Sequence, residues 1–167
     1  YNLVHLSTGD IFRANIKGET ELGLKAKSYI DKGDLVPDEV TISMLESEVN
    51  NYSDPKGFIF DGFPRTTAQA EALDNFLGSK GTSITMMLAL EVENEELKKR
   101  LLERGKISGR SDDQNPEIIE NRINEYNNKT APLKAFYEAQ GKFQSIDGMG
   151  SIDEISQRLY LAVDQSQ

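Results

Sequence analysis

The stretch "GFIFDGFPRT" (residues 57–66) joins an apolar run to an acid, a turn and a guanidinium group. Its three consecutive apolar residues lead directly into Asp61, and Gly62, Pro64 and Arg65 follow at once. A continuous apolar run is typical of a strand that is covered on both faces, as in a parallel α/β sheet. In such sheets, ligands bind beyond the carboxyl ends of the strands. The stretch therefore predicts a buried strand that ends at a ligand-binding turn.

Strand and helix patterns alternate along the rest of the chain. Further strands are expected at residues 2–7, 83–92 and 142–147. Helical patterns occupy residues 35–49, 66–77, 94–104 and 116–140, with a bend or break expected at 130–132, and a last helix opens at Ser151. This alternation predicts right-handed βαβ units in a doubly wound parallel sheet with flanking helices. Because no repeat or linker interrupts the pattern, residues 1–167 are expected to form one domain.

The composition restricts the classes of function. The chain has 167 residues, of which 37% are hydrophobic and 28% charged, as is typical of a soluble globular protein. Its net charge of -9 argues against broad binding to nucleic acid or to an anionic membrane, and no segment has the apolar length of a membrane span. The absence of cysteine excludes disulfides and thiolate metal sites. The single histidine, His5, is expected at a core or strand-edge position and not in a catalytic relay.

Two of the predicted strands end in sequences that suit a phosphate group. The first ends in "STGDIFR" (residues 7–13), which is typical of the start of a helix, where free backbone N–H groups can receive an anion. In the second, Gly62 allows a ligand to approach the backbone, and Pro64 fixes the turn. Arg65 follows, and an arginine fork binds phosphate oxygens through two parallel hydrogen bonds.

Arginines recur near the predicted strand ends and on the inward faces of helices. Arg100 and Arg104 are four residues apart, so they share one helix face with Leu97 and Leu101. Any one of them could be an ordinary surface arginine, with its stem on apolar groups and its head in water. The complete set comprises Arg13, Arg65, Arg100, Arg104, Arg110 and Arg122. In an acidic chain, six arginines in such positions predict a binding site for one polyanion.

Four motifs in a fixed order resemble those of the adenylate kinases, in the nucleoside monophosphate kinase family. They are "STGDIFR", "DGFPRTTAQ", "GRSDD" and "NRINEYNNKTAPL", and the resemblance covers essentially the whole chain. It implies a P-loop NTPase-like α/β fold and an enzyme that converts ATP and AMP to two ADP with Mg²⁺. It further implies a cytoplasmic monomer whose partners are these nucleotides, with no nucleic acid and no membrane. Residues 7–36 would form the AMP-binding region and residues 103–113 a short lid without zinc.

The resemblance also implies roles for single residues. The AMP-binding set would be Thr8, Arg13, Asp34, Leu35, Val36, Gly62, Phe63, Pro64, Arg65, Gln69, Arg110 and Arg122, with Gln69 reading the adenine edge. The catalytic set would be Arg65, Arg100, Arg104, Arg110 and Arg122, and the ATP-binding set Arg100, Arg104, Gly148 and Gly150. Asp61 would orient the water shell of Mg²⁺.

One family motif is not found among these residues. No G-x-x-x-x-G-K-[ST] spacing occurs, and in the family that loop follows the first, central strand of the sheet. The 167 residues are therefore expected to be a truncated or incompletely represented kinase that lacks this strand and loop. We expect such a chain to have no significant kinase activity. Its sheet is expected to have a gap or to recruit a replacement strand.

Three alternatives remain open at the level of the sequence. A pyrimidine monophosphate kinase for UMP or CMP would share most of the motifs, although Thr8 and Gln69 favour adenine. A non-catalytic AMP-binding fragment would fit the missing loop. The third alternative is a plain α/β domain with scattered arginines, in which the motifs would not form a common binding site.

Overall fold

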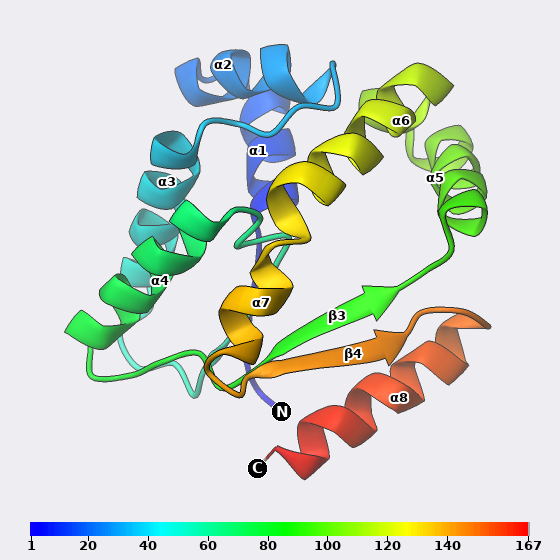
Figure 1. Ribbon diagram of the computed structural model, residues 1–167. Coiled ribbons are helices and arrows are strands. Elements are labelled where there is room, and N and C mark those ends of the chain that lie inside the picture. The colour runs from blue at the N-terminus through cyan, green and yellow to red at the C-terminus, as the bar shows by residue number, and fades with distance from the viewer. Residues whose placement is uncertain (167) are drawn as a thin grey trace.

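The computed structural model describes residues 1–166, which fold into helices and short parallel strands (Figure 1). The strands are β1 (Val4–Ser7), β2 (Phe58–Asp61), β3 (Met87–Glu91) and β4 (Phe143–Asp147). The α-helices are α1 (Thr8–Lys17), α2 (Glu21–Ile30), α3 (Asp38–Asn50), α4 (Thr67–Ser79), α5 (Asn94–Ser108), α6 (Pro116–Glu125), α7 (Leu133–Glu138) and α8 (Ile152–Gln165). A 3₁₀ turn, η1 (Ser111–Asp113), precedes α6, and a π-helical turn, η2 (Tyr126–Thr130), follows it. The predicted α/β class is therefore confirmed.

The strands form two separate parallel pairs. β1 pairs with β2, with Val4 opposite Phe58, and β3 pairs with β4, with Met87 opposite Phe143. Within residues 1–166 no pairing joins one pair to the other. The prediction of a gap in the sheet is confirmed, whereas a single doubly wound sheet is not formed by these strands.

Most elements lie where the sequence predicts them, and the differences have local causes. The strand expected at residues 83–92 is ordered as a strand only over Met87–Glu91. The long helix expected at residues 116–140 is interrupted by η2 and by Pro132, as its sequence predicts. Helix α2 was not predicted. It carries Gly23 in its first turns because α1 passes very close, and a Cβ at Gly23 would lie 2.1 Å from the Asn15 carbonyl oxygen.

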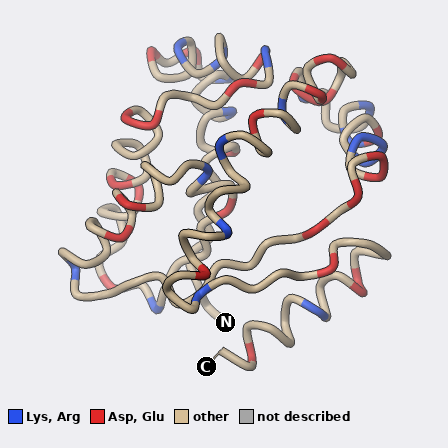
Figure 2. The backbone as a smooth tube through the Cα atoms, viewed as in Figure 1, with Lys and Arg blue, Asp and Glu red and all other residues tan. Residues whose placement is uncertain are grey.

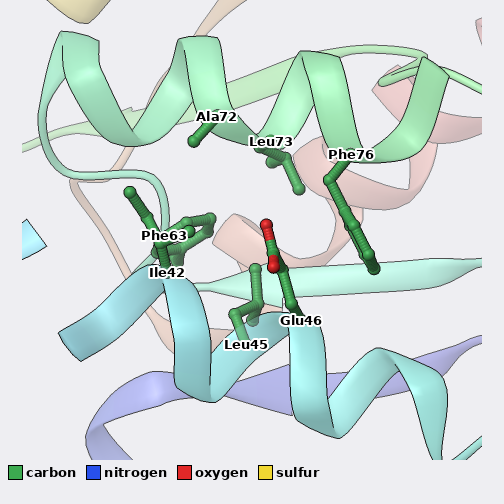
Figure 3. A pocket seen from close by; sticks show the side chains of 7 residues that line it. All are labelled: Ile42, Leu45, Glu46, Phe63, Ala72, Leu73 and Phe76. Atoms are coloured by element: carbon green, nitrogen blue, oxygen red, sulfur yellow. The ribbon is translucent and has the colours of Figure 1, made fainter. Parts of the chain in front are cut away.

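The largest cluster of buried side chains in the described residues lies around β1, β2, α3 and α4. Its buried members are Leu6, Leu45, Val49, Phe63, Leu73 and Leu77. Figure 3 shows Ile42 and Leu45 of α3 facing Leu73 and Phe76 of α4 across a small, largely apolar hollow. A second cluster joins α1, α2 and α3, and a third joins α4 to α7. These clusters fix the carboxyl ends of β1 and β2 relative to the helices that follow them.

Neither strand pair is covered on both faces, contrary to the prediction from their apolar runs: Ile59 of β2 is 48% exposed and Leu90 of β3 is 47% exposed. The pair β3–β4 packs with α8. Figure 1 shows these elements together at the lower right, away from α3 and α4. Figure 2 shows both strands without charged residues until Glu91 and Asp147 at their ends. On α8, Ile152 is 83% exposed and Leu161 59% exposed. Over residues 1–166, no helix combines the length and the apolar character needed to cross a membrane.

Candidate active site

The turn after β2 is locked by hydrogen bonds to a single carbonyl group. The Gly62 carbonyl oxygen accepts from Arg65 Nε at 2.8 Å and from Thr8 Oγ1 at 3.1 Å. Gly62 has φ +74, and a Cβ there would lie 2.9 Å from the Arg65 guanidinium, so the position requires glycine. The structure thus brings Thr8, at the start of α1, to Arg65, as expected for the carboxyl ends of two neighbouring parallel strands.

The start of α1 contributes backbone donors and a further arginine. The Ser7 side chain caps the helix by accepting from the Asp10 backbone N–H at 3.3 Å. Arg13, one turn further along, forms an ion pair with Asp10, and this hydrogen bond lowers the pKa of the Asp10 carboxyl group. The helix start, Arg13 and Arg65 therefore lie at one edge of the β1–β2 pair.

The arginines of this edge act on one another electrostatically. Burial lowers the pKa of Arg65, and the positive charges of Arg122 and Arg13 lower it further. Burial also lowers the pKa of Arg110, with additional repulsion from Arg104 and Arg13. Five of the six predicted arginines thus lie near one another in one cluster: Arg13, Arg65, Arg104, Arg110 and Arg122. Asp61, Asp112 and Asp113 lie with them and offset part of their charge. A bound polyanion would relieve the repulsion within the cluster.

Asp113 organises two of these arginines, and the sequence did not predict its role. Its fully buried carboxylate accepts from Arg104 Nε at 2.6 Å and Nη2 at 3.1 Å, and from Arg122 Nη1 at 2.5 Å. Burial opposes ionisation, but the hydrogen bonds and positive charges of the two arginines outweigh it and hold the pKa of Asp113 below its usual range. The only signal in the sequence was an acid beside Arg110 in "GRSDD".

Arg100 lies with Gly148 and Gly150 at the end of the other strand pair. Its Nη1 donates to the Gly148 carbonyl at 2.7 Å and its Nε to Glu96 at 3.0 Å. Arg158, which sequence reasoning missed, supports the same loop by donating to the Asp147 and Met149 carbonyls at 2.8 and 2.6 Å. The predicted ATP-binding residues therefore lie in two places. Arg104 is bound to Asp113, whereas Arg100, Gly148 and Gly150 lie together at the loop after β4.

Asp61 ends β2 with its side chain largely in solvent. The side chain is 61% exposed, and one of its oxygens lies 3.1 Å from His5 Nε2. His5 is itself exposed, in β1, so the strand-edge prediction for it is confirmed. Within the described residues, no group of three or more acidic or histidine side chains could hold a metal ion by itself. Asp61 could contribute to a metal site only together with ligands from elsewhere.

Gln69 lies against the Gly62–Arg65 turn. The residue is only 2% exposed, its Oε1 accepts from the Arg65 backbone N–H at 2.7 Å, and its Nε2 donates to Asp38 Oδ1 at 2.9 Å. The side chains of Val36 and Phe63 are buried in the core clusters. Those two residues could meet a ligand only through their backbone.

The loop that carries Asp34, Leu35 and Val36 is held against α6 and η1. Asn121 Nδ2 donates to Asp34 Oδ1 and to the Lys32 carbonyl, each at 2.7 Å, and Ser111 Oγ donates to Asp31 Oδ1 at 2.7 Å. Asn121 precedes Arg122 in the chain. The loop and the arginine cluster therefore share one support.

Comparisons with known proteins show which family the chain resembles. A family model described as adenylate kinase matches residues 1–142. An adenylate kinase of Flavobacterium psychrophilum is 63% identical over 159 residues, which are 95% of this chain and 84% of the relative. One from Flavobacterium johnsoniae is 57% identical over 98% of this chain and 86% of the relative. One from Thermobifida fusca is 49% identical over 95% of this chain and 83% of the relative.

Proposed function

Because this chain belongs to the adenylate kinase family, we propose that it transfers a phosphoryl group reversibly between ATP and AMP, giving two ADP, with Mg²⁺ as the metal ion. Membership of this family makes the chain a phosphotransferase enzyme. The observation that carries the proposal is the cluster of arginines behind the locked Gly62–Arg65 turn. We expect the protein to act as a cytoplasmic monomer on free nucleotides.

The AMP phosphate would bind between the two strand ends. Arg13 and Arg65 supply guanidinium groups there, and the start of α1 supplies backbone N–H groups. The loop of residues 34–36 and Gln69 would enclose the base. Because most of these groups already have protein partners that fix their positions, AMP would meet a preorganised site.

The transfer itself would depend on charge and position. Phosphoryl transfer needs the attacking and leaving oxygens in line and dense positive charge on the transferred group, with little covalent help from the protein. Arg110 and Arg122 would supply that charge from the short lid and from α6. Asp113 keeps Arg104 and Arg122 in place through its three hydrogen bonds.

The residues fit a magnesium ion that is carried by the nucleotide. Mg²⁺ keeps several of its waters and binds readily to phosphate oxygens. The exposed Asp61 carboxylate, at the carboxyl end of β2, could orient those waters without being a direct ligand. When bound, the ion would neutralise charge on the phosphates, while the arginines hold their oxygens.

The ATP half of the reaction requires more than these residues provide. Arg100, Gly148 and Gly150 would contact the ATP end, but no G-x-x-x-x-G-K-[ST] spacing occurs in residues 1–167. β1 pairs only with β2, and β3 only with β4. We infer that a further strand would pair between β1 and β3 in a complete ATP site. A polypeptide of these 167 residues alone is expected to bind AMP without significant transfer.

Equilibrium titration with AMP, UMP and CMP tests the substrate assignment. We expect AMP to bind more tightly than either pyrimidine nucleotide, and tighter UMP or CMP binding would favour a pyrimidine kinase. A coupled assay for ADP formation, on the same polypeptide, tests the expectation that these residues alone carry out no significant phosphoryl transfer. Near-normal ADP formation would overturn the claim that the ATP site is incomplete in these residues.

A further inference from the structure

Asp38 joins the starts of two helices at the back of the proposed AMP site. It is the first residue of α3, and its Oδ1 accepts from Gln69 Nε2 at 2.9 Å and from Thr66 Oγ1 at 3.0 Å. Thr66 is the N-cap of α4, and its hydroxyl oxygen also accepts from the Gln69 backbone N–H at 3.2 Å. The proposed function gives Asp38 no role, although it is in direct contact with the residue expected to read the base.

The partners of the Gln69 amide allow only one orientation of that amide. An ionised carboxylate can only accept hydrogen bonds, so the amide nitrogen must face Asp38. A backbone N–H can only donate, so the amide oxygen must face Arg65. Turning the amide over would place two acceptors together at Asp38 and two donors together at Arg65. The Arg65 carbonyl is held in turn by Thr130 Oγ1 at 2.6 Å, which fixes the donor side.

We propose that Asp38 is a positioning residue that sets the base specificity of the AMP site by fixing the orientation of the Gln69 amide. The inference rests on the proposed function, in which Gln69 meets the base. An amide in this orientation keeps one N–H and one oxygen lone pair free. Adenine offers the complementary pair, a ring nitrogen acceptor beside the N6 amino donor, so the contact can be bidentate.

Hypoxanthine, the base of IMP, is the sharpest test of such a fixed amide. It carries an oxygen acceptor where adenine carries the amino donor, and a protonated N1 where adenine carries an acceptor. Against the fixed Gln69 amide, acceptor would face acceptor and donor would face donor along the N1 edge. Along the N7 edge, both groups of hypoxanthine are acceptors, so one contact is lost. An amide that could turn over would accommodate the N1 edge of IMP.

A simple structural link between α3 and α4 would also explain the Asp38 contacts. That reading predicts that loss of the carboxylate weakens every ligand of the site to the same extent, through a loosened framework. The positioning role predicts a change in the ratio of AMP to IMP affinity, while a ligand without a base binds as before. Ribose 5-phosphate is such a ligand, because it retains the phosphate and sugar.

The experiment compares wild type, Asp38→Asn and Glu39→Gln by titration calorimetry with AMP, IMP and ribose 5-phosphate. Asparagine keeps the shape of Asp38 but can donate as well as accept, so it removes one of the two restraints on the Gln69 amide. Glu39 is the exposed neighbouring acid in the same helix turn, and its change to Gln is the matched control. Asp38→Ser, whose hydroxyl also donates and accepts, is the second variant should Asp38→Asn not fold.

We expect wild type and Glu39→Gln to prefer AMP to IMP. In Asp38→Asn, the preference should fall by a factor of about five to ten, with ribose 5-phosphate affinity unchanged. An unchanged AMP to IMP ratio in Asp38→Asn, or an equal loss for all three ligands, would overturn the positioning role and leave the proposed function intact. A wild type that does not prefer AMP to IMP would overturn the adenine assignment itself, and the inference with it.

Discussion

The two strand pairs of the molecule differ in how completely their surroundings are built. At the end of β1–β2, Thr8, Gly62, Arg65 and Gln69 are tied together by hydrogen bonds over a buried core. At the end of β3–β4, Arg100 and Arg158 hold a loop, and these strands border the core only through half-buried residues such as Met87 and Phe143. The difference indicates that the proposed AMP half of the site is organised by these residues themselves. At the end of β3–β4, the residues proposed for the ATP half are fewer: Arg100, Gly148 and Gly150.

The largest expected difference between the regions is in the free energy of unfolding. Leu73 is 2% exposed beneath β1–β2, and truncation there leaves a cavity, so Leu73→Ala should cost about 3 kcal/mol. Leu161 on α8 is exposed, so Leu161→Ala should change stability by less than about 0.5 kcal/mol. Urea denaturation of both variants measures the contrast. Equal losses would show that the two regions are packed alike.

Arg65→Ala should have the largest effect on ligand binding. It removes a guanidinium fork from the proposed phosphate site, at a cost of about 2–3 kcal/mol for charged hydrogen bonds, or roughly a hundredfold in AMP affinity. Arg158→Ala is the matched control, because Arg158 supports the loop at the end of β4. In a titration with AMP, the affinity of Arg158→Ala should be close to that of wild type. A similar loss of affinity in both variants would contradict the separation of the two regions.

Asp113→Asn should destabilise the protein by about 2 kcal/mol at neutral pH, since two arginines lose their buried counter-charge. The folded-state pKa of Asp113 lies below its ordinary value of 3.8, so the stabilisation is fully present above that value. It is lost as the pH falls through the lower folded-state pKa. Denaturation at pH 7 and pH 3 should therefore show a smaller difference from wild type at pH 3. The exposed Asp153→Asn serves as control, and a difference that grows in acid would refute the assignment.

Asn121→Ala should have the smallest of these effects. It removes two hydrogen bonds to the loop of residues 32–34, each worth about 1 kcal/mol at most in this partly exposed setting. We expect AMP affinity to fall by a factor of about three to ten as the loop loosens. Asn124→Ala, an exposed asparagine on the same helix, should have no effect. Identical affinities for the two variants would show that the support from α6 does not reach the AMP site.

The strand and turn of residues 57–66 could be predicted because their pattern depends on local rules, but the prediction that the strand is covered on both faces is wrong, since Ile59 is 48% exposed. An apolar run, Gly62 at positive φ and an arginine at the strand end each follow from the sequence, and parallel strands bring Thr8 to the same edge. Asp113 and Asp38 could not be predicted. The burial of an acid depends on partners that only the tertiary fold supplies, here Arg104 and Arg122 or Gln69 and Thr66. Helix α2 was not predicted because Gly23 weakens the helical pattern of its sequence. In the fold, the same glycine allows α2 to pack closely on α1.

Titration of a polypeptide of these 167 residues with AMP and, separately, with ATP–Mg²⁺ tests the contrast between the two halves most directly. If these residues organise the AMP half alone, AMP should bind saturably and Arg65→Ala should abolish most of that binding. ATP–Mg²⁺ should bind far more weakly, because no G-x-x-x-x-G-K-[ST] loop is present to hold its phosphates. ATP–Mg²⁺ binding as tight as that of AMP, at a site that Arg65→Ala leaves intact, would contradict the account.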